Sequence, residues 1–186
     1  MAIMCQFKFN AAADEEAYVF GAQRPGYNST TPISDAEVTS WIEFMQRKGV
    51  KRVCCLLEDQ LSLYASDLIE TYKYSFGEEA VCWAPIKDFC LANENLLIET
   101  VLPFLAESVR KDEPVVVHCS GGSGRTGHVL AAWLVYGRSM TNNRAIDTVI
   151  RQGRNPYEAE GRDDTGKAKL NSLLDACRVA SLNGSR

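Results

Sequence analysis

The 186-residue sequence has few of the residues from which metal sites and disulfide frameworks are built. Its only histidines are His118 and His128, so histidine-based metal chemistry is not expected. The seven cysteines are scattered without a C-x-x-C pair, and an odd number cannot all pair within one chain. This usage predicts neither a zinc site nor a disulfide framework, and it favours a reducing, cytoplasmic environment.

Long apolar runs and runs of basic residues are also missing. No stretch approaches the length needed to span a membrane, and the N-terminus lacks the basic and apolar regions of a signal peptide. The net charge is −4, and no cluster of Lys and Arg offers a face to a phosphate backbone. We therefore expect neither a membrane nor a nucleic acid partner, while the sequence leaves the oligomeric state open.

Apolar residues make up 46% of the chain and charged residues 24%, as in ordinary globular proteins. Strand-like runs alternate with helical patterns. Strands are expected at 50–57, 80–83 and 115–119, and helices at 34–48, 61–74, 93–110, 125–136, 141–152 and 165–180. This order predicts a single α/β domain over residues 1–186, with a central, mostly parallel twisted sheet of about four or five strands and helices on both faces. Residues 1–30 could form an N-terminal extension.

Local signals refine this outline. Ser34 and Glu37 have the spacing of a capping box at the start of a helix. Residues 18–20 are apolar enough for a short strand. Arg24 lies in a turn-rich segment and is expected to be a solvated loop residue. Pro103 is expected to kink or divide the helix that contains it.

The most informative stretch is residues 115–127, with the sequence VVVHCSGGSGRTG. Three valines lead to His118 and Cys119, small residues including three glycines follow, and Arg125 opens a long apolar run. This pattern predicts a buried strand, a tight loop and the first turn of a buried helix. The backbone N–H groups of such a loop, together with the helix N-terminus, form a concave site for an anion the size of phosphate.

Two side chains give this loop a chemistry. A helix N-terminus and a nearby guanidinium favour the ionised thiolate of Cys119, which is the nucleophilic form of cysteine. Arg125 presents a planar fork that matches two oxygens of a phosphoryl group. A nucleophile, an anion cradle and a bidentate clamp are thus expected side by side.

The pattern His118-Cys119-x-x-Gly122-x-x-Arg125-Thr126 resembles the signature loop of the cysteine-dependent protein tyrosine phosphatases, in particular their compact dual-specificity branch. The resemblance implies Cys119 as nucleophile and a Thr126 hydroxyl that stabilises the departing thiolate. His118 resembles the histidine that positions the loop, although a satisfied core histidine is an equal interpretation. No metal or cofactor is implied. The implied phosphate-binding residues are Ser120, Gly121, Gly122, Ser123, Gly124 and Arg125.

A phosphatase of this type also needs an acid for the leaving oxygen. Asp88 is the candidate, because residues 85–88 resemble the proline–aliphatic–x–aspartate acid loop of small dual-specificity phosphatases. Asp59 is the reserve candidate. Loops 58–60 and 84–88 are expected to meet the phosphate loop at the carboxyl ends of the parallel strands, where ligands bind in such sheets.

Two other interpretations use the same residues. Gly122, Gly124 and Gly127 match a dinucleotide-binding fingerprint, with Asp147 as the ribose-binding acid. That interpretation needs a strand ending at Asp147, whereas residues 129–150 have a helical pattern.

The other alternative is a glycine-rich turn beside a buried structural cysteine. It gives Arg125 no reason to open a buried helix.

We therefore expect a phosphatase that hydrolyses phosphotyrosine, and also phosphoserine and phosphothreonine, through a phosphocysteine intermediate. Its partners would be phosphorylated proteins or peptides. The interior of the loop, residues 120–124, lacks the extra lysine or arginine that phosphoinositide-directed relatives often use. A phosphatase for a non-protein substrate such as a phosphoinositide stays an alternative. So does a catalytically weak module that binds phosphate or phosphoproteins.

Overall fold

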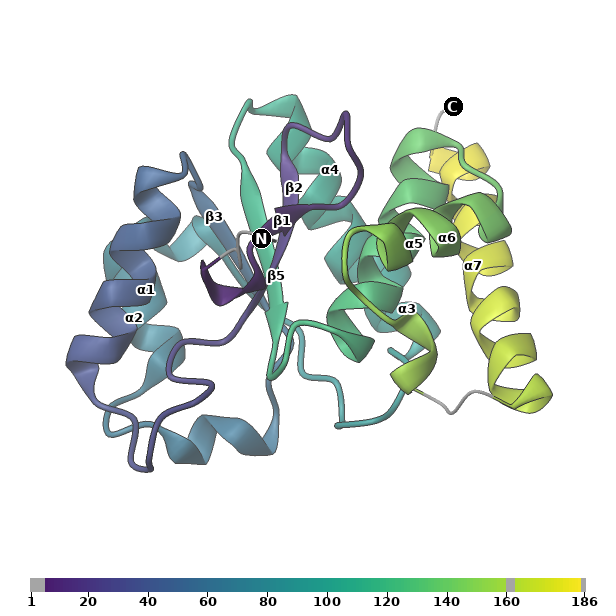
Figure 1. The fold of residues 1–186 in the computed structure, drawn as a ribbon. Coiled ribbons are helices and arrows are strands. Elements are labelled where there is room, and N and C mark those ends of the chain that lie inside the picture. Colours follow the sequence, from purple (N-terminus) through teal and green to yellow (C-terminus); the bar gives the residue numbers. More distant parts are fainter. Residues whose placement is uncertain (1–5, 160–162, 185–186) are drawn as a thin grey trace.

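The computed structural model describes residues 6–159 and 163–184. A five-stranded sheet lies between two layers of helices (Figure 1). The strands, in the sheet order β1-β2-β5-β3-β4, are Asn10–Ala11, Val19–Gln23, Val115–Cys119, Arg52–Cys55 and Val81–Trp83. Only β1 is antiparallel to its neighbour, and the other strand pairs are parallel. The predicted α/β class and mostly parallel sheet are confirmed.

The helices follow the predicted alternation with the strands. They are α1 (Asp35–Arg47), α2 (Leu68–Phe76), α3 (Glu94–Leu96), α4 (Leu102–Arg110), α5 (Gly124–Arg138), α6 (Asn142–Arg151) and α7 (Asp164–Gly184). In Figure 1, α1 and α2 cover one face of the sheet, and α3 to α7 lie on the other side. No helix in the described ranges combines the length and the apolar character needed to cross a membrane.

The strand that carries the predicted loop lies at the centre of the sheet. β5 pairs with β2 on one side and with β3 on the other, and all five of its residues are buried. A run of three valines suits this position, because a central parallel strand is covered on both faces. The expected strand at 18–20 is confirmed as part of β2, so residues within 1–30 build the sheet directly beside β5.

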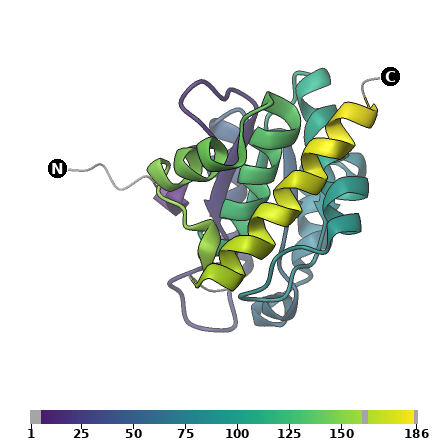
Figure 2. The same ribbon diagram turned by 90° about the vertical axis from the view of Figure 1, so that its right-hand side faces the viewer.

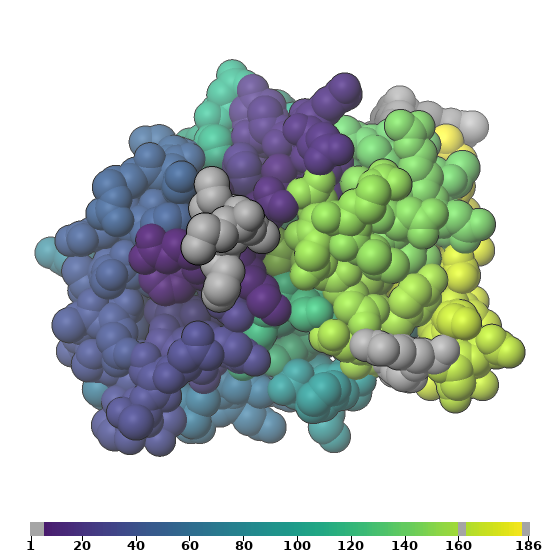
Figure 3. All heavy atoms as spheres, viewed as in Figure 1, coloured from purple at the N-terminus to yellow at the C-terminus, as the bar shows by residue number. Residues whose placement is uncertain are grey.

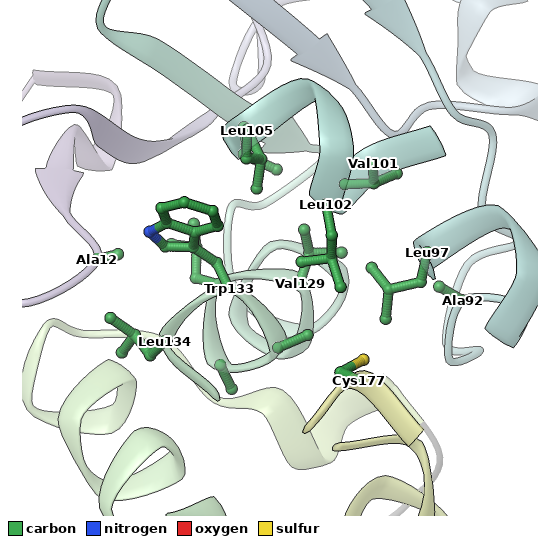
Figure 4. Close-up of a cluster of buried hydrophobic side chains, with 14 of the residues drawn as sticks. Ala12, Ala92, Leu97, Val101, Leu102, Leu105, Val129, Trp133, Leu134 and Cys177 are labelled. Atoms are coloured by element: carbon green, nitrogen blue, oxygen red, sulfur yellow. The ribbon is translucent and has the colours of Figure 1, made fainter. Parts of the chain in front are cut away.

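Each face of the sheet has its own apolar core. Cys54 points into the cluster on the α5 side and Cys55 into the cluster under α1 and α2, as expected for neighbours on one strand. Figure 4 shows the α5-side cluster, where Trp133 faces Leu105 of α4 and Cys177 enters from α7. α5 is buried on nearly all of its faces between the sheet and the outer helices. Figure 2 shows α7 running across the outside of this layer.

Two predicted helices are divided in the structure. The predicted helix over 61–74 is wrong in its first half, because residues Asp59–Leu63 form a 3₁₀ turn and α2 starts only after Asp67. The Asp67 carboxylate accepts hydrogen bonds from the N–H groups of Ile69 and Glu70, which defines a new helix N-terminus. In the 93–110 helix, a π-helical turn at Leu97–Val101 precedes Pro103, which confirms the expected interruption.

α1 begins as its capping box predicts. The Ser34 hydroxyl accepts a hydrogen bond from the Glu37 N–H, and the Glu37 carboxylate accepts one from the Ser34 N–H. Trp41 of this helix is fully buried, and its indole N–H donates to the carbonyl of Gln23 at the end of β2. The helix thereby fixes the segment that leads from β2 to the predicted site.

Candidate active site

Two of the predicted loops, after β4 and β5, line a pocket of about 300 Å³ at the carboxyl ends of these strands, and Gln60 of the loop after β3 contacts Arg125 and Asp88 in its wall. Its wall contains residues from five separate parts of the chain. They are Lys8, Tyr27, Asp88, Phe89, Cys119, Ser120, Gly121, Ser123, Gly124, Arg125, Glu158 and Ala159. In Figure 3 the surface is hollowed where the purple, teal and light green parts of the chain come together. The pocket therefore lies where it was predicted, at the carboxyl ends of the parallel strands.

Cys119 is the last residue of β5 and is almost completely buried at the base of the pocket. The hydroxyl of Thr126, in the first turn of α5, donates a hydrogen bond to the Cys119 sulfur at 3.1 Å. α5 begins at Gly124, so the partial positive charge of its N-terminus faces the same pocket. Both features stabilise negative charge on the sulfur.

Gly122 differs from the other loop residues in its placement. It does not line the pocket, and its φ of +66° is the left-handed conformation that favours glycine. A Cβ at this position would lie 2.6 Å from the Ala22 carbonyl oxygen of β2. The loop therefore packs its back directly against the neighbouring strand, and the remaining predicted phosphate-binding residues, Ser120, Gly121, Ser123, Gly124 and Arg125, face the pocket.

Two buried arginines that sequence reasoning missed hold the loop from behind. Arg154 is 2% exposed and donates from Nη1 to the Gly122 carbonyl at 2.5 Å and from Nη2 to the Lys8 carbonyl at 3.1 Å. Burial lowers the pKa of Arg154 to about 10. No carboxylate in residues 6–159 or 163–184 forms an ion pair with it. Its charge is thus available to the phosphate loop.

Arg24 corrects an expectation. It is 7% exposed rather than solvated, and its Nε donates to the Ser120 hydroxyl at 3.3 Å. Its Nη1 donates to the carbonyls of Pro25 and Gly26, so the guanidinium is enclosed by the turn it belongs to. The backbone of Arg24 also donates to the Ser120 carbonyl. A turn-rich sequence indicated a loop correctly, but not that the loop folds over the phosphate site.

Arg125 connects the phosphate loop to the other two loops. Its Nη1 donates to the Ile86 carbonyl at 2.9 Å and to the Gln60 side chain at 3.3 Å. Its Nη2 forms an ion pair with Asp88 at 3.0 Å. The Gln60 amide also donates to the other Asp88 oxygen at 3.3 Å, so these three side chains form a closed triangle.

The structure distinguishes the two candidate acids by position. Asp88 lines the pocket and is 44% exposed, so its carboxylate reaches both Arg125 and solvent. Asp59 opens the 3₁₀ turn after β3 and is absent from the pocket wall. Gln60, its neighbour, was not singled out by the sequence, although loop 58–60 was expected at the site.

Both histidines are fully buried and neutral. Burial lowers the pKa of His118 to about 3 and that of His128 to about 4. The His118 ring lies beside Trp41 and contacts the Tyr72 hydroxyl at 3.1 Å, with its other nitrogen 3.4 Å from the Cys119 carbonyl. His118 therefore is a core residue that also contacts the backbone of the loop.

His128 joins the loop after β5 to the loop after β4. One ring nitrogen contacts the Gly124 carbonyl at 3.2 Å, and the other accepts a hydrogen bond from the Ala92 N–H at 3.0 Å. Because a neutral imidazole has one donor and one acceptor, Nδ1 must carry the proton. The sequence gave no signal for this role, since His128 lies within an apolar helical run.

The dinucleotide-binding interpretation is wrong. Asp147 lies within α6, whereas a ribose-binding acid needs to follow a second strand.

Within the described ranges, no group of three or more His, Cys, Asp and Glu side chains is arranged to hold a metal ion.

Comparison with solved structures finds the same fold in several phosphatases. Tk-PTP in its active form is 25% identical, with a TM-score of 0.63, and the match covers 86% of this chain and 93% of that one. TpbA of P. aeruginosa, in complex with pTyr, is 16% identical with a TM-score of 0.62, covering 98% and 95%. PTPMT1 in complex with PI(5)P is 13% identical with a TM-score of 0.66, covering 92% and 97%.

A search of curated protein sequences found no match. The family model Tc-R-P, described as polymorphic toxin system, DSP-PTPase phosphatase, matches residues 26–138. That range contains Asp88, the phosphate loop and α5, and so it includes the predicted nucleophile, clamp and acid. The chain belongs to this family of DSP-PTPase phosphatases.

Proposed function

We propose that this protein is a phosphatase that hydrolyses phosphotyrosine in proteins or peptides, and also phosphoserine and phosphothreonine, through a phosphocysteine intermediate. The observation that carries the proposal is the pocket itself. Cys119 lies at its base with the Thr126 hydroxyl on its sulfur, and Arg125 and Asp88 share its wall. A module that only bound phosphate would need neither a nucleophile nor an acid.

In the first step the Cys119 thiolate attacks phosphorus, and the S–P bond forms as the P–O bond to the leaving group breaks. Protonated Asp88 transfers its proton to the leaving oxygen. The loop N–H groups and the Arg125 guanidinium bind the equatorial oxygens, whose charge they stabilise through fixed geometry.

In the second step a water molecule attacks the phosphocysteine. Asp88, now ionised, accepts the proton of the water while the new P–O bond forms and the S–P bond breaks. The Thr126 hydroxyl donates to the departing thiolate, in the contact already present at 3.1 Å. Phosphate leaves, and Cys119 and Asp88 regain their starting states.

The ion pair between Arg125 and Asp88 suggests how the substrate prepares the acid. A phosphate dianion competes for the Arg125 fork that Asp88 contacts. When the phosphate takes that fork, the Asp88 carboxyl group is released from Arg125 and is free to face the leaving oxygen.

The mouth of the pocket supports an aryl phosphate as the preferred substrate. Tyr27 and Phe89 both line it, with exposed fractions of 42% and 74%. Aromatic side chains at a pocket mouth bind an aromatic ring through dispersion and edge or stacking contacts. The hydroxyl of Tyr27 lies 3.3 Å from the Cβ position of Gly121, so this ring stands directly over the phosphate loop.

We also propose a cytoplasmic location, because a thiolate nucleophile needs reducing conditions. The six cysteines in the described ranges are all free thiols, namely Cys54, Cys55, Cys82, Cys90, Cys119 and Cys177.

The test is hydrolysis of an aryl phosphate and of a phosphotyrosine peptide in the presence of a chelator. We expect turnover by the wild-type protein and a loss of about 10⁴-fold or more in Cys119→Ser. Rapid acid quench of the wild-type reaction, followed by mass spectrometry, should find the phosphoryl group on Cys119. If the wild-type protein binds the phosphopeptide without turnover, the protein is a binding module and the phosphatase proposal is wrong.

A further inference from the structure

We propose that Lys8 recognises an acidic residue next to the phosphorylated residue of a peptide substrate. This inference rests on the proposed function, since it assigns the flanking chemistry of the same substrate. Lys8 lies far from the phosphate loop in sequence, yet it lines the same pocket as Cys119 and Arg125. Its side chain is exposed, and the ion pairs of residues 6–159 and 163–184 do not include it.

The segment that carries Lys8 is fixed rather than loose. Phe7 packs edge-on against Phe44 with ring centroids 5.3 Å apart, and Phe9 stacks on Phe20 at 4.9 Å. These two rings anchor the residues on either side of Lys8. The Lys8 ammonium is therefore presented at the pocket by a backbone of defined position.

The same segment is tied to the phosphate loop. Arg154 donates to the Lys8 carbonyl and to the Gly122 carbonyl, so one buried guanidinium sets the distance between them. Both Phe7 and Lys8 adopt left-handed backbone conformations, with φ of 58° and 47°. Such conformations are unfavourable for residues with a side chain and persist only where surrounding contacts enforce them.

The charges around the pocket determine where an acidic residue of the substrate is bound. Arg125 is engaged by Asp88 or by the scissile phosphate, and the loop interior contains no further cation. Glu158 lines the pocket beside the phosphate loop, where its Cβ lies 2.9 Å from the Cβ position of Gly124. An anion beside the scissile phosphate is repelled at Glu158 and attracted at Lys8, so the acidic part of the substrate is directed towards Lys8.

A polypeptide fits the surface beyond Lys8. Lys8 and Tyr27 also line a neighbouring hollow of about 400 Å³. The amide and hydroxyl side chains around this hollow are suited to hydrogen bonds with an extended peptide backbone. They are Gln6, Gln23, Asn28, Ser29 and Ser40.

The experiment compares two phosphotyrosine peptides that differ only in having glutamate or glutamine on both sides of the phosphotyrosine. We expect wild-type kcat/KM to be about two- to fivefold higher for the glutamate peptide, which corresponds to one partly exposed charge pair. Lys8→Met should abolish the preference, Lys8→Glu should invert it, and Lys8→Arg should keep it. Lys51→Met, which removes an exposed lysine outside the pocket, is the matched control and should keep the wild-type ratio.

Salt provides a second readout, because added salt should reduce the wild-type ratio but leave the Lys8→Met ratio unchanged. Equal ratios in the wild-type protein and Lys8→Met would overturn the Lys8 proposal while leaving the phosphatase intact. If neither peptide is hydrolysed by the wild-type protein nor bound by Cys119→Ser, the proposed function fails and this proposal with it. If Lys8→Met instead weakens only the hydrolysis of vesicles containing a phosphoinositide, Lys8 recognises a lipid headgroup and the peptide proposal is wrong.

Discussion

The phosphate loop and the acid loop of this protein are held in different ways. The phosphate loop, residues 119–125, is fixed from behind by buried groups, which include Arg24, Arg154 and Thr126. The acid loop, residues 84–92, is anchored at its ends by backbone hydrogen bonds to β3 and by His128, but it exposes Asp88 and Phe89, and Arg125 binds the Asp88 carboxylate. The loop that must bind charge is therefore rigid before substrate arrives. The loop that must move a proton depends on the side chain that the substrate engages.

This difference separates two tasks. A preorganised cradle stabilises transition-state charge because its dipoles need no reorientation during the reaction. An acid whose ion-pair partner is taken up by the substrate is released to face the leaving group when the substrate binds. Variants of the two loops should accordingly differ in whether they change chemistry, stability or both.

After Cys119→Ser, the largest expected effect is that of Asp88→Asn. We expect kcat for a phosphate ester with a poor leaving group to fall about 10²- to 10⁴-fold, because proton transfer to the leaving oxygen is lost. The basic limb of the pH–rate profile should disappear with it. Asp59→Asn is the control and should stay near wild type. If Asp59→Asn instead loses the activity, the acid has been assigned to the wrong loop.

Gly122→Ala tests the rigid loop. The new Cβ would lie 2.6 Å from the Ala22 carbonyl oxygen, and alanine would have to adopt the left-handed conformation. We expect a loss of about 2–4 kcal/mol in the free energy of unfolding, from strain and overpacking together. Activity should fall as the cradle shifts. Gly77→Ala has a positive φ but nothing within 4 Å of its Cβ, so urea unfolding should find a loss of only about 1–2 kcal/mol there.

Acid should weaken the link that His128 makes between the loops. Burial lowers its pKa to about 4, so below the ordinary value of 6.5 the unfolded chain binds a proton that the folded chain does not. The free energy of unfolding should therefore fall as pH drops from 6.5 towards 4, by about 2 kcal/mol at about pH 5 from this residue. Urea unfolding at several pH values should detect a smaller dependence in His128→Gln. Some pH dependence should remain in the variant, because the pKa of His118 is also lowered by burial. An identical pH dependence in the wild-type protein and in His128→Gln would contradict the role assigned to His128.

The smallest expected effect is that of Gln60→Leu. This variant removes both hydrogen bonds that Gln60 makes, to Arg125 and to Asp88, each at 3.3 Å. We expect kcat/KM to fall about three- to tenfold, as for hydrogen bonds of about 1 kcal/mol, with an unchanged melting temperature. Gln46→Leu, on the exposed side of α1, is the control. A wild-type kcat/KM in Gln60→Leu would mean that Asp88 is positioned by Arg125 alone.

Sequence reasoning predicted the phosphate loop well because its determinants are local. A buried strand, small residues and a helix start follow one another within residues 115–127, and Thr126 meets Cys119 as the resemblance implied. The acid loop was predicted only in part. Asp88 lies in the pocket as expected, but its contact with Gln60 depends on how two strands bring their ends together.

The arginines behind the loop could not be predicted for a related reason. Arg24 and Arg154 each lie in a polar, turn-forming stretch, where most arginines are solvated. Their burial depends on contacts with distant residues, since Arg24 contacts Ser120, 96 positions away, and Arg154 contacts Gly122, 32 positions away. The prediction of one helix over 61–74 was wrong because Asp67 caps the N-terminus of α2. This capping signal is local, but the apolar spacing of the whole stretch suggested a continuous helix.

The position of Arg154 between distant parts of the chain has a consequence for folding. Its guanidinium joins a segment before β1, the loop after β5 and the loop after α6, and these contacts close long stretches of chain. Contacts of high sequence separation carry a large loop-closure entropy and tend to form late. During refolding, helical structure should therefore recover before phosphatase activity, and the return of activity would report that the segment before β1 and the loop after α6 have docked on the phosphate loop.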